Sequence, residues 1–184
     1  MTNSKARNAV AAVLIGPPGA GKSTVGPLLA AELGVAFTDT DAEVEATAGK
    51  PVGDIFVEDG EPAFRELERA AVARALEAAQ GVVAVGGGAV LDPGTQAKLA
   101  GCPVVYLDTG FAVAAKRVGL GQARPLLIGN PRSTLKILLD QRIPVYQRLA
   151  TITVRTDDRE PAEIAADIAS RLAGQRRHAG ETPQ

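Results

Sequence analysis

The octapeptide GPPGAGKS at residues 16–23 follows directly after the apolar run VAAVLI and leads into the helix-forming residues TVGPLLAAEL. It fits the pattern G-x-x-x-x-G-K-[ST]. Because glycine has no Cβ, successive backbone N–H groups in such a loop can point inward and surround phosphate oxygens. The following helix presents its positive N-terminal end to the same anion. The stretch therefore predicts a buried strand, a phosphate-binding loop and a helix, in that order.

The residue types in this loop indicate a nucleoside triphosphate, and we expect ATP. Lys22 would reach the β- and γ-phosphates, and the hydroxyl of Ser23 would bind Mg²⁺. The other residues expected around the phosphates are Gly19, Ala20, Gly21 and Thr24. The guanine-binding pattern NKxD is absent from the sequence, which argues against a GTPase switch.

Short apolar runs alternate with segments of helical periodicity along the chain. The runs that predict strands are apolar at consecutive positions, as in strands buried on both faces. They are 10–15, 35–38, 82–85, 103–107 and 151–155. The predicted helices are 22–33, 41–48, 61–80, 93–99, 111–117, 132–148 and 160–173. This alternation predicts an α/β fold, a parallel sheet with helices on both sides.

Composition limits the function classes. With 184 residues the chain is most simply one domain. Its net charge of −1 provides no field to recruit nucleic acid or an anionic membrane, so an anionic ligand must be held by local cations. A single cysteine, Cys102, excludes an internal disulfide and a multi-cysteine zinc site. No apolar run approaches the ~20 residues of a membrane span, and no signal-peptide pattern is present, so we expect a cytoplasmic protein.

Carboxylates follow the second predicted strand, in the tetrapeptide TDTD at 38–41. If this segment is extended, Asp39 and Asp41 share one face and point into the same cleft. One carboxylate would then serve the metal and the other an acceptor hydroxyl. The alternative is that Asp41 only caps the next helix.

Cations and glycines that could hold an acceptor follow later in the chain. Arg65 and Glu68 are spaced i, i+3 in FRELE, which suits an ion pair on one helix face, although such pairs are commonly surface pairs. Gly86–Gly88 end a buried strand, which indicates that another group approaches the main chain closely. Arg124 lies in a glycine-rich segment that could close over a transferring phosphoryl group. Arg142 lies on a predicted helix, where spacing alone does not separate a site residue from a surface residue.

The ordered set of motifs resembles shikimate kinase. The resemblance extends over about residues 12–172 and depends on GPPGAGKS, the D-T-D at 39–41, the run DIF…DGE…FRELE at 54–68, GGGAV, RPLL at 124–127 and RIPVY at 142–146. It implies a P-loop NTPase fold like that of nucleoside monophosphate kinases, with three α/β/α layers, a five-stranded parallel sheet and a mobile lid. The implied reaction transfers the γ-phosphoryl group of ATP to the 3-hydroxyl of shikimate, with Mg²⁺, on the route to chorismate and the aromatic amino acids.

The resemblance also implies a division of the chain. A single kinase domain would span 1–184, with its core at about 10–174 and loose tails at 1–8 and 174–184. The acceptor-binding region would be about 39–68 and the lid about 119–131. The enzyme would work as a monomer on a small-molecule substrate, without nucleic acid or membrane.

Matched by position, the resemblance implies two groups of site residues. On the acceptor side, Asp41 would bind the acceptor hydroxyls, and Arg65 and Arg142 the carboxylate. The pocket would be lined by Gly86, Gly87, Gly88, Phe56 and Phe64. On the nucleotide side, Asp39 would lie near the metal with Ser23, and Arg124 would stabilise the transferring phosphoryl group. Arg117 and the segment 159–161, with Arg159, would enclose adenine.

Three alternatives stay open from the sequence. A gluconate kinase would share the phosphate loop, but Arg65, Arg142 and the triple glycine together disfavour it. A nucleoside monophosphate kinase would need a nucleobase pocket, which this layout does not suggest. A nucleotide-binding regulator without turnover belongs to a different class of protein, and acceptor-dependent ADP release would separate it from the kinases.

Overall fold

The computed structural model describes residues 10–78, 80–118 and 131–180. The predicted lid at 119–131, including Arg124, lies outside these residues except for Pro131, where a helix begins. In the part of the chain that is described, no helix combines the length and the apolar character needed to cross a membrane.

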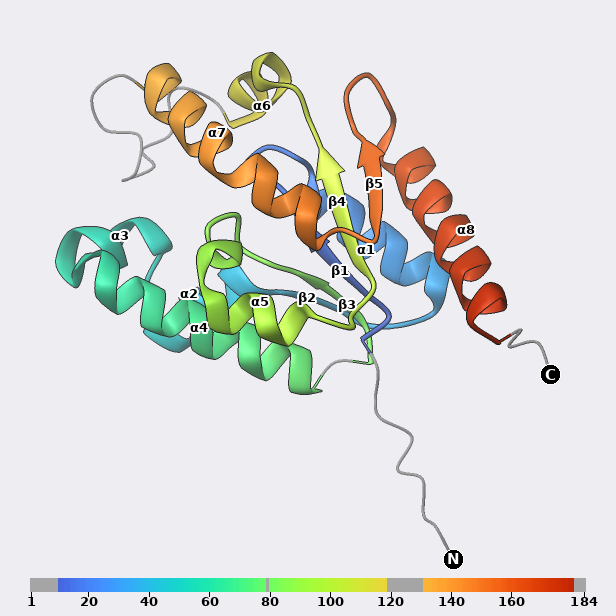
Figure 1. Ribbon diagram of the computed structural model, residues 1–184. Helices are drawn as coiled ribbons and strands as arrows, with labels where there is room; N and C mark the ends of the chain where they lie inside the picture. The colour runs from blue at the N-terminus through green and yellow to red at the C-terminus, as the bar shows by residue number, and fades with distance from the viewer. Residues whose placement is uncertain (1–9, 79, 119–130, 181–184) are drawn as a thin grey trace, which may run out of the picture.

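Five parallel strands form one sheet, as predicted, in the order β2-β3-β1-β4-β5 (Figure 1). The strands are β1 (Ala12–Ile15), β2 (Phe37–Asp39), β3 (Val82–Ala84), β4 (Val104–Asp108) and β5 (Ile152–Arg155). The strand before the phosphate loop, β1, lies in the middle of the sheet, and every residue of it is buried. The segments that follow β1, β2 and β3 therefore meet at the carboxyl edge of the sheet, where open α/β sheets bind ligands.

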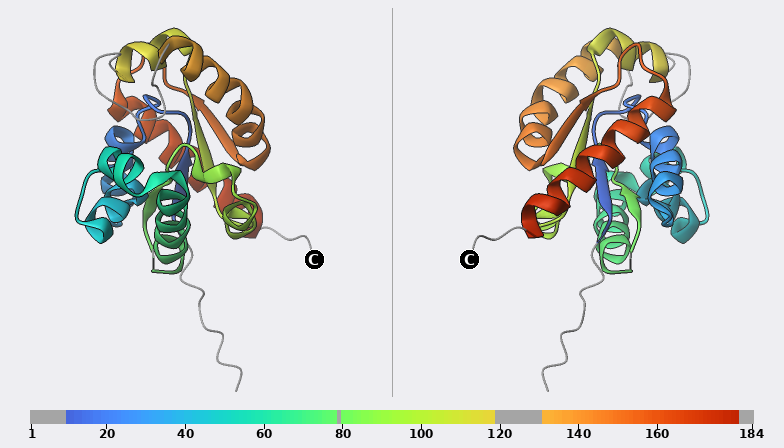
Figure 2. Two further views of the ribbon diagram at one scale, coloured as in Figure 1. Left: turned by 90° about the vertical axis from the view of Figure 1, so that its left-hand side faces the viewer. Right: turned by 90° about the vertical axis from the view of Figure 1, so that its right-hand side faces the viewer.

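Helices cover both faces of the sheet, which explains why the strands are apolar at consecutive positions. Leu14 and Val105 pack toward α1 (Lys22–Leu33) and α8 (Pro161–Gly180). Their neighbours Val13 and Tyr106 pack on the other face, toward α4 (Gly60–Ala78), α5 (Pro93–Leu99) and α7 (Pro131–Leu149). The side views show α1 and α7 on opposite sides of the strands (Figure 2).

A smaller helical unit extends from the sheet and borders the carboxyl edge. It contains α2 (Thr40–Ala48), α3 (Val52–Glu58) and α4 as far as Ala71, which share a core of Val44, Ile55, Phe64 and Ala71. The backbone N–H of Val52 donates to Glu45 Oε1 at 2.9 Å, and this bond ties the start of α3 to α2. The unit gives the acceptor-binding region predicted at 39–68 a compact structure.

Three elements differ from the sequence-based expectation. Neither α3 nor the 3₁₀ turn η1 (Ala89–Leu91) was predicted from the sequence. The last helix, α8, continues to Gly180, so the tail predicted to be loose from 174 is helical through that residue. The remaining described helix, α6 (Phe111–Val118), lies where it was predicted.

Gly81, immediately before β3, provides a test of the β2–β3 pairing. A Cβ at this position would collide with the carbonyl oxygen of Ala36, which accepts the N–H of Val82 at 2.9 Å. Gly81→Ala should therefore lower the free energy of unfolding by about 1–3 kcal/mol, measured by urea denaturation.

The matched control is Gly174→Ala in α8, where an added Cβ meets no described atom within 4 Å apart from the backbone of its own helix. There alanine should raise stability by up to about 1 kcal/mol, its helix-propensity advantage over glycine. Equal effects of the two substitutions would contradict the tight approach of Gly81 to Ala36.

Candidate active site

The phosphate loop has a backbone shape that requires glycine. Gly19 and Gly21 have φ of 80° and 97°, in the region that side-chain-bearing residues rarely adopt, and Gly21 is the N-cap of α1. The ammonium group of Lys22 donates to the carbonyl oxygens of Gly16 at 2.8 Å and Pro17 at 3.2 Å. Lys22 is thus held across the mouth of the loop, where the sequence pattern places the phosphates.

Ser23 and Asp39 are brought together from α1 and from the end of β2. The hydroxyl of Ser23 donates to Asp39 Oδ2 at 2.7 Å. A hydroxyl and a carboxylate beside a phosphate loop are the hard oxygen ligands that Mg²⁺ prefers. The residues present therefore fit the metal site implied by the sequence.

The capping role belongs to Asp39 and not to Asp41. Asp39 Oδ1 accepts the backbone N–H of Asp41 at 3.0 Å, as an N-cap carboxylate does. The segment 38–41 is not extended throughout, because β2 ends at Asp39 and Asp41 lies in the first turn of α2. Both carboxylates nevertheless line the same cavity. Asp39 is the N-cap of α2 and Asp41 lies in its first turn, so the two residues stay close together.

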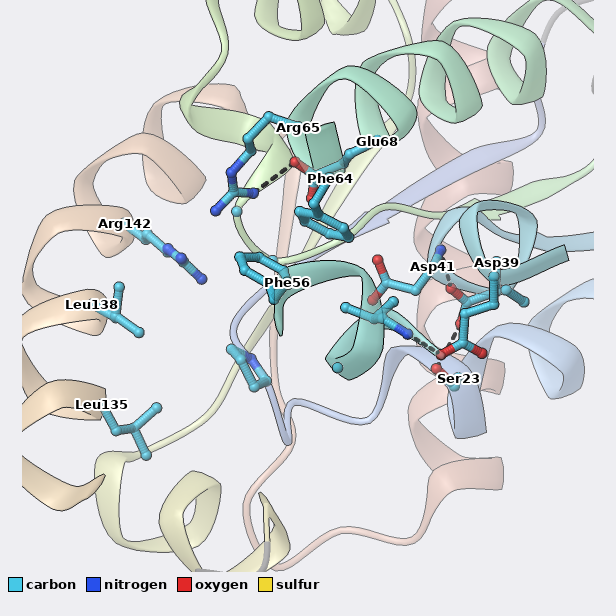
Figure 3. A pocket seen from close by; sticks show the side chains of 17 residues that line it. Ser23, Asp39, Asp41, Phe56, Phe64, Arg65, Glu68, Leu135, Leu138 and Arg142 are labelled. Carbon is cyan, nitrogen blue, oxygen red and sulfur yellow. Dashed lines mark hydrogen bonds and ion pairs between the residues drawn. The ribbon is translucent and has the colours of Figure 1, made fainter. Parts of the chain in front are cut away.

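A cavity of about 470 Å³ lies between the helical unit α2–α4 and α7, at the carboxyl edge of the sheet (Figure 3). Its polar and aromatic lining contains the predicted residues Ser23, Asp39, Asp41, Phe56, Phe64, Arg65, Gly87, Gly88 and Arg142. In Figure 3 the two arginines lie at one end of the cavity and Asp39 and Asp41 at the other, with the two phenylalanines between them. The rings of Phe56 and Phe64 have centroids 4.5 Å apart and form an apolar wall.

The Arg65–Glu68 pair predicted from FRELE is present. Arg65 Nη1 donates to Glu68 Oε2 at 2.7 Å, and Arg65 also contacts Glu61 on the same helix. The pair is not a surface pair, because Glu68 is 3% exposed. The Arg65 guanidinium lies 5.3 Å from the ring centroid of Phe64, so the aromatic wall also holds it in place.

The triple glycine accommodates the charged side chains of the site. A Cβ on Gly88 would lie 2.6 Å from Arg65 Nη1. A Cβ on Gly86 would lie 2.7 Å from Asp41 Oδ1 and 2.9 Å from Glu68 Oε1. The close approach predicted from the glycines is therefore an approach of side chains within the site, and any larger residue there would displace them.

Arg142 is buried in the cavity wall. It is 4% exposed, and within the described part of the chain its Nε has no hydrogen-bond partner. Figure 3 shows the guanidinium directed from α7 toward the space that Arg65 borders from α4. A buried guanidinium N–H without an acceptor is costly, so this arrangement favours binding of an anion in the cavity.

Arg117 and Arg159, matched to the adenine side, lie outside this cavity. Arg117 donates to the carbonyl of Gly19 at 3.3 Å and to that of Thr156 at 3.1 Å, which places it beside the phosphate loop. Arg159 pairs with Asp167 of α8 at 3.1 Å. Arg117 is thus next to the phosphate loop, whereas the contacts of Arg159 are with α8 and with the carbonyl of Arg155 at the end of β5.

Some lining residues were not singled out from the sequence. Leu135 and Leu138 add an apolar surface from α7, and Glu45 and Val52 add lining from α2 and α3. Leu135, Leu138 and Arg142 follow one another at i, i+3 and i+7, so helical spacing could have placed the leucines on the face of Arg142.

The environment of Glu68 predicts a pH dependence of stability. Burial raises the pKa of Glu68 above its ordinary value of 4.5, although Arg65 opposes the shift. A carboxyl with a higher pKa in the folded chain keeps its proton more firmly there, so its ionisation destabilises the fold. The free energy of unfolding should fall as pH rises from 4.5 through the folded-state pKa, and Glu68→Gln should remove that part of the fall.

The measurement is urea denaturation of both proteins between about pH 4 and about pH 8. Glu66→Gln is the control, because Glu66 is exposed on the same helix. If the two variants change the pH profile equally, the burial of Glu68 is not the source of the effect.

The comparisons with known proteins agree with the geometry. The family model described as shikimate kinase matches residues 18–173. The shikimate kinase of Thermobifida fusca is 63% identical over 161 residues, which cover 88% of this chain and 94% of that protein. The shikimate kinase of Salinispora arenicola is 58% identical over 161 residues, covering 88% and 96%.

Solved structures show the same fold. A shikimate kinase from Acinetobacter baumannii in complex with shikimate has a TM-score of 0.85 and 34% identity, covering 90% of this chain and 93% of that one. A gluconokinase from Sinorhizobium meliloti has a TM-score of 0.61 at 24% identity, covering 94% and 97%. The second likeness shows the P-loop NTPase fold alone, whereas the family model and the curated relatives decide between the two kinases. The chain belongs to the shikimate kinase family.

Proposed function

We propose that the protein transfers the γ-phosphoryl group of ATP to the 3-hydroxyl of shikimate, giving shikimate 3-phosphate and ADP. The observation that carries this proposal is the buried guanidinium of Arg142, which shares a cavity with Arg65 and whose Nε has no hydrogen-bond partner among the described residues. A carboxylate held between two arginines would satisfy these donors.

The rest of the cavity suits the other groups of shikimate. Phe56 and Phe64 would pack against its six-membered carbon ring. Asp41, at the end of the cavity away from the arginines, would accept a hydrogen bond from the hydroxyl that is phosphorylated. With the carboxylate fixed at the arginine end, this hydroxyl would face Ser23 and the phosphate loop.

On the nucleotide side, the backbone of Gly19–Thr24 and the ammonium of Lys22 would bind the phosphates of ATP. Lys22 would exchange its bonds to the Gly16 and Pro17 carbonyls for phosphate oxygens. Ser23 and Asp39 would hold Mg²⁺, which neutralises phosphate charge when bound there. Arg117 and Arg159 would adjoin the adenine, and Arg124, outside the described residues, would stabilise the transferring group.

Catalysis by this site would depend on positioning and charge. A phosphoryl transfer with a loose transition state requires alignment of the nucleophile and neutralisation of charge more than a strong base. Asp41 would orient the 3-hydroxyl toward the γ-phosphorus and accept its proton as the new P–O bond forms. The leaving ADP oxygen would keep the electron pair of the broken bond.

We further propose that the enzyme works as a monomer in the cytoplasm, without nucleic acid or membrane. The described residues of a single chain are sufficient to line the acceptor cavity. The net charge of −1 gives no general attraction to polyanions.

The test is ADP release from Mg²⁺-ATP with shikimate, with gluconate and without an acceptor. We expect release that depends on shikimate, and Lys22→Ala should lower it by about 10²-fold or more because phosphate charge is no longer neutralised. Release with gluconate alone would favour a gluconate kinase. No release with any acceptor would favour a nucleotide-binding regulator.

The role of Arg142 predicts a selective defect. Arg142→Ala should raise the KM for shikimate by about 10- to 150-fold, the equivalent of about 1.5–3 kcal/mol for a charged hydrogen bond, with little change in the KM for ATP.

Arg148→Ala is the matched control on the same helix, since Arg148 is exposed and donates to Gln96 outside the cavity. An unchanged KM for shikimate in Arg142→Ala, or an equal change in Arg148→Ala, would refute the carboxylate-binding role.

A further inference from the structure

Tyr146 links two walls of the acceptor cavity without lining it. It lies on α7 one helical turn after Arg142 and is 0% exposed. Its hydroxyl donates to the carbonyl oxygen of Gly87 at 2.6 Å. This bond joins the last turn of α7 to the glycine run after β3, across 59 residues of sequence.

The same hydroxyl meets Arg142. Residues at i and i+4 lie on one face of a helix, so the two side chains are neighbours. A tyrosine hydroxyl has one hydrogen, and here Gly87 receives it, so the hydroxyl can only accept from the guanidinium. Burial raises the pKa of Tyr146 to about 12 while the nearby Arg142 lowers it, so the hydroxyl keeps its hydrogen at neutral pH.

The ring of Tyr146 is fixed by a second tyrosine. It stacks on Tyr106 of β4 with centroids 5.3 Å apart and an interplanar angle of 24°. The Tyr106 hydroxyl donates in another direction, to Asp108 Oδ1 at 3.0 Å. The two stacked rings therefore share their packing, but only the Tyr146 hydroxyl reaches the acceptor cavity wall.

This part of α7 has fewer backbone hydrogen bonds than a regular helix. Pro144 lies between Arg142 and Tyr146 and has no N–H, so one backbone bond of this turn is absent. The bond from Tyr146 to Gly87 supplies a tertiary connection at that place.

We infer that Tyr146 is a positioning residue that sets the Arg142 guanidinium at a fixed place relative to the Gly87 backbone, and so determines how tightly the acceptor carboxylate is held. The inference rests on the proposed function, because it concerns the same acceptor. Tyr146 itself touches neither substrate, and acts through Arg142 and Gly87.

The test compares Tyr146→Phe with Tyr106→Phe. Each variant removes one buried hydroxyl and keeps the stacked rings. Tyr146→Phe should raise the KM for shikimate by about 3- to 10-fold, the size of one or two net hydrogen bonds, while kcat and the KM for ATP change less than about 2-fold. Tyr106→Phe should leave all three constants within about 2-fold of wild type. Thermal unfolding of both variants measures how much stability each hydroxyl contributes. A general loss of stability can then be distinguished from a change in the KM for shikimate.

A double-mutant cycle with Arg142→Ala identifies the route of the effect. Because Tyr146 acts largely through Arg142, Tyr146→Phe should raise the KM for shikimate much less in the Arg142→Ala background than in wild type. Equal increases in both backgrounds, or equal constants for Tyr146→Phe and Tyr106→Phe, would overturn the inference. A wild-type protein that releases no shikimate-dependent ADP would instead overturn the proposed function.

Discussion

The candidate site is organised around a buried charge. Glu68 is 3% exposed, and removing an ionised carboxylate from water costs several kcal/mol unless partners compensate. Arg65, one turn earlier on α4, offsets part of this cost at 2.7 Å, and the charge of Arg142 from α7 acts in the same direction. The adjacent glycines are required because Arg65, Asp41 and Glu68 occupy the space where a Cβ would lie.

This cluster makes the two ends of the cavity opposite in charge. The arginines come from α4 and α7, which pack on the same face of the sheet, and lie away from the phosphate loop. Asp39 and Asp41 follow β2 and lie next to Ser23 at the other end. An acceptor with a carboxylate at one end and hydroxyls at the other can therefore bind in one orientation, with a hydroxyl next to the phosphate loop.

Features with a local cause could be predicted from the sequence, and features set by tertiary contacts could not. The phosphate loop, the five strands and the Arg65–Glu68 pair follow from spacing within a few residues, and the structure has them. The sequence left open whether Asp41 caps the next helix, and in the structure Asp39 is the cap, because one residue decides whether TDTD continues a strand or starts a helix. The burial of Arg142 and the bond from Tyr146 to Gly87 depend on how α7 packs against a distant glycine run, which periodicity does not encode.

The most direct test of this account is calorimetric binding of shikimate and of its uncharged carboxamide to the protein. The two molecules have nearly the same shape, and only shikimate offers a carboxylate to Arg65 and Arg142. The account predicts that the carboxamide binds at least about 10-fold more weakly, as expected when charge-assisted hydrogen bonds become neutral ones. Equal affinities would show that the buried arginines do not recognise the acceptor, and would contradict the central claim.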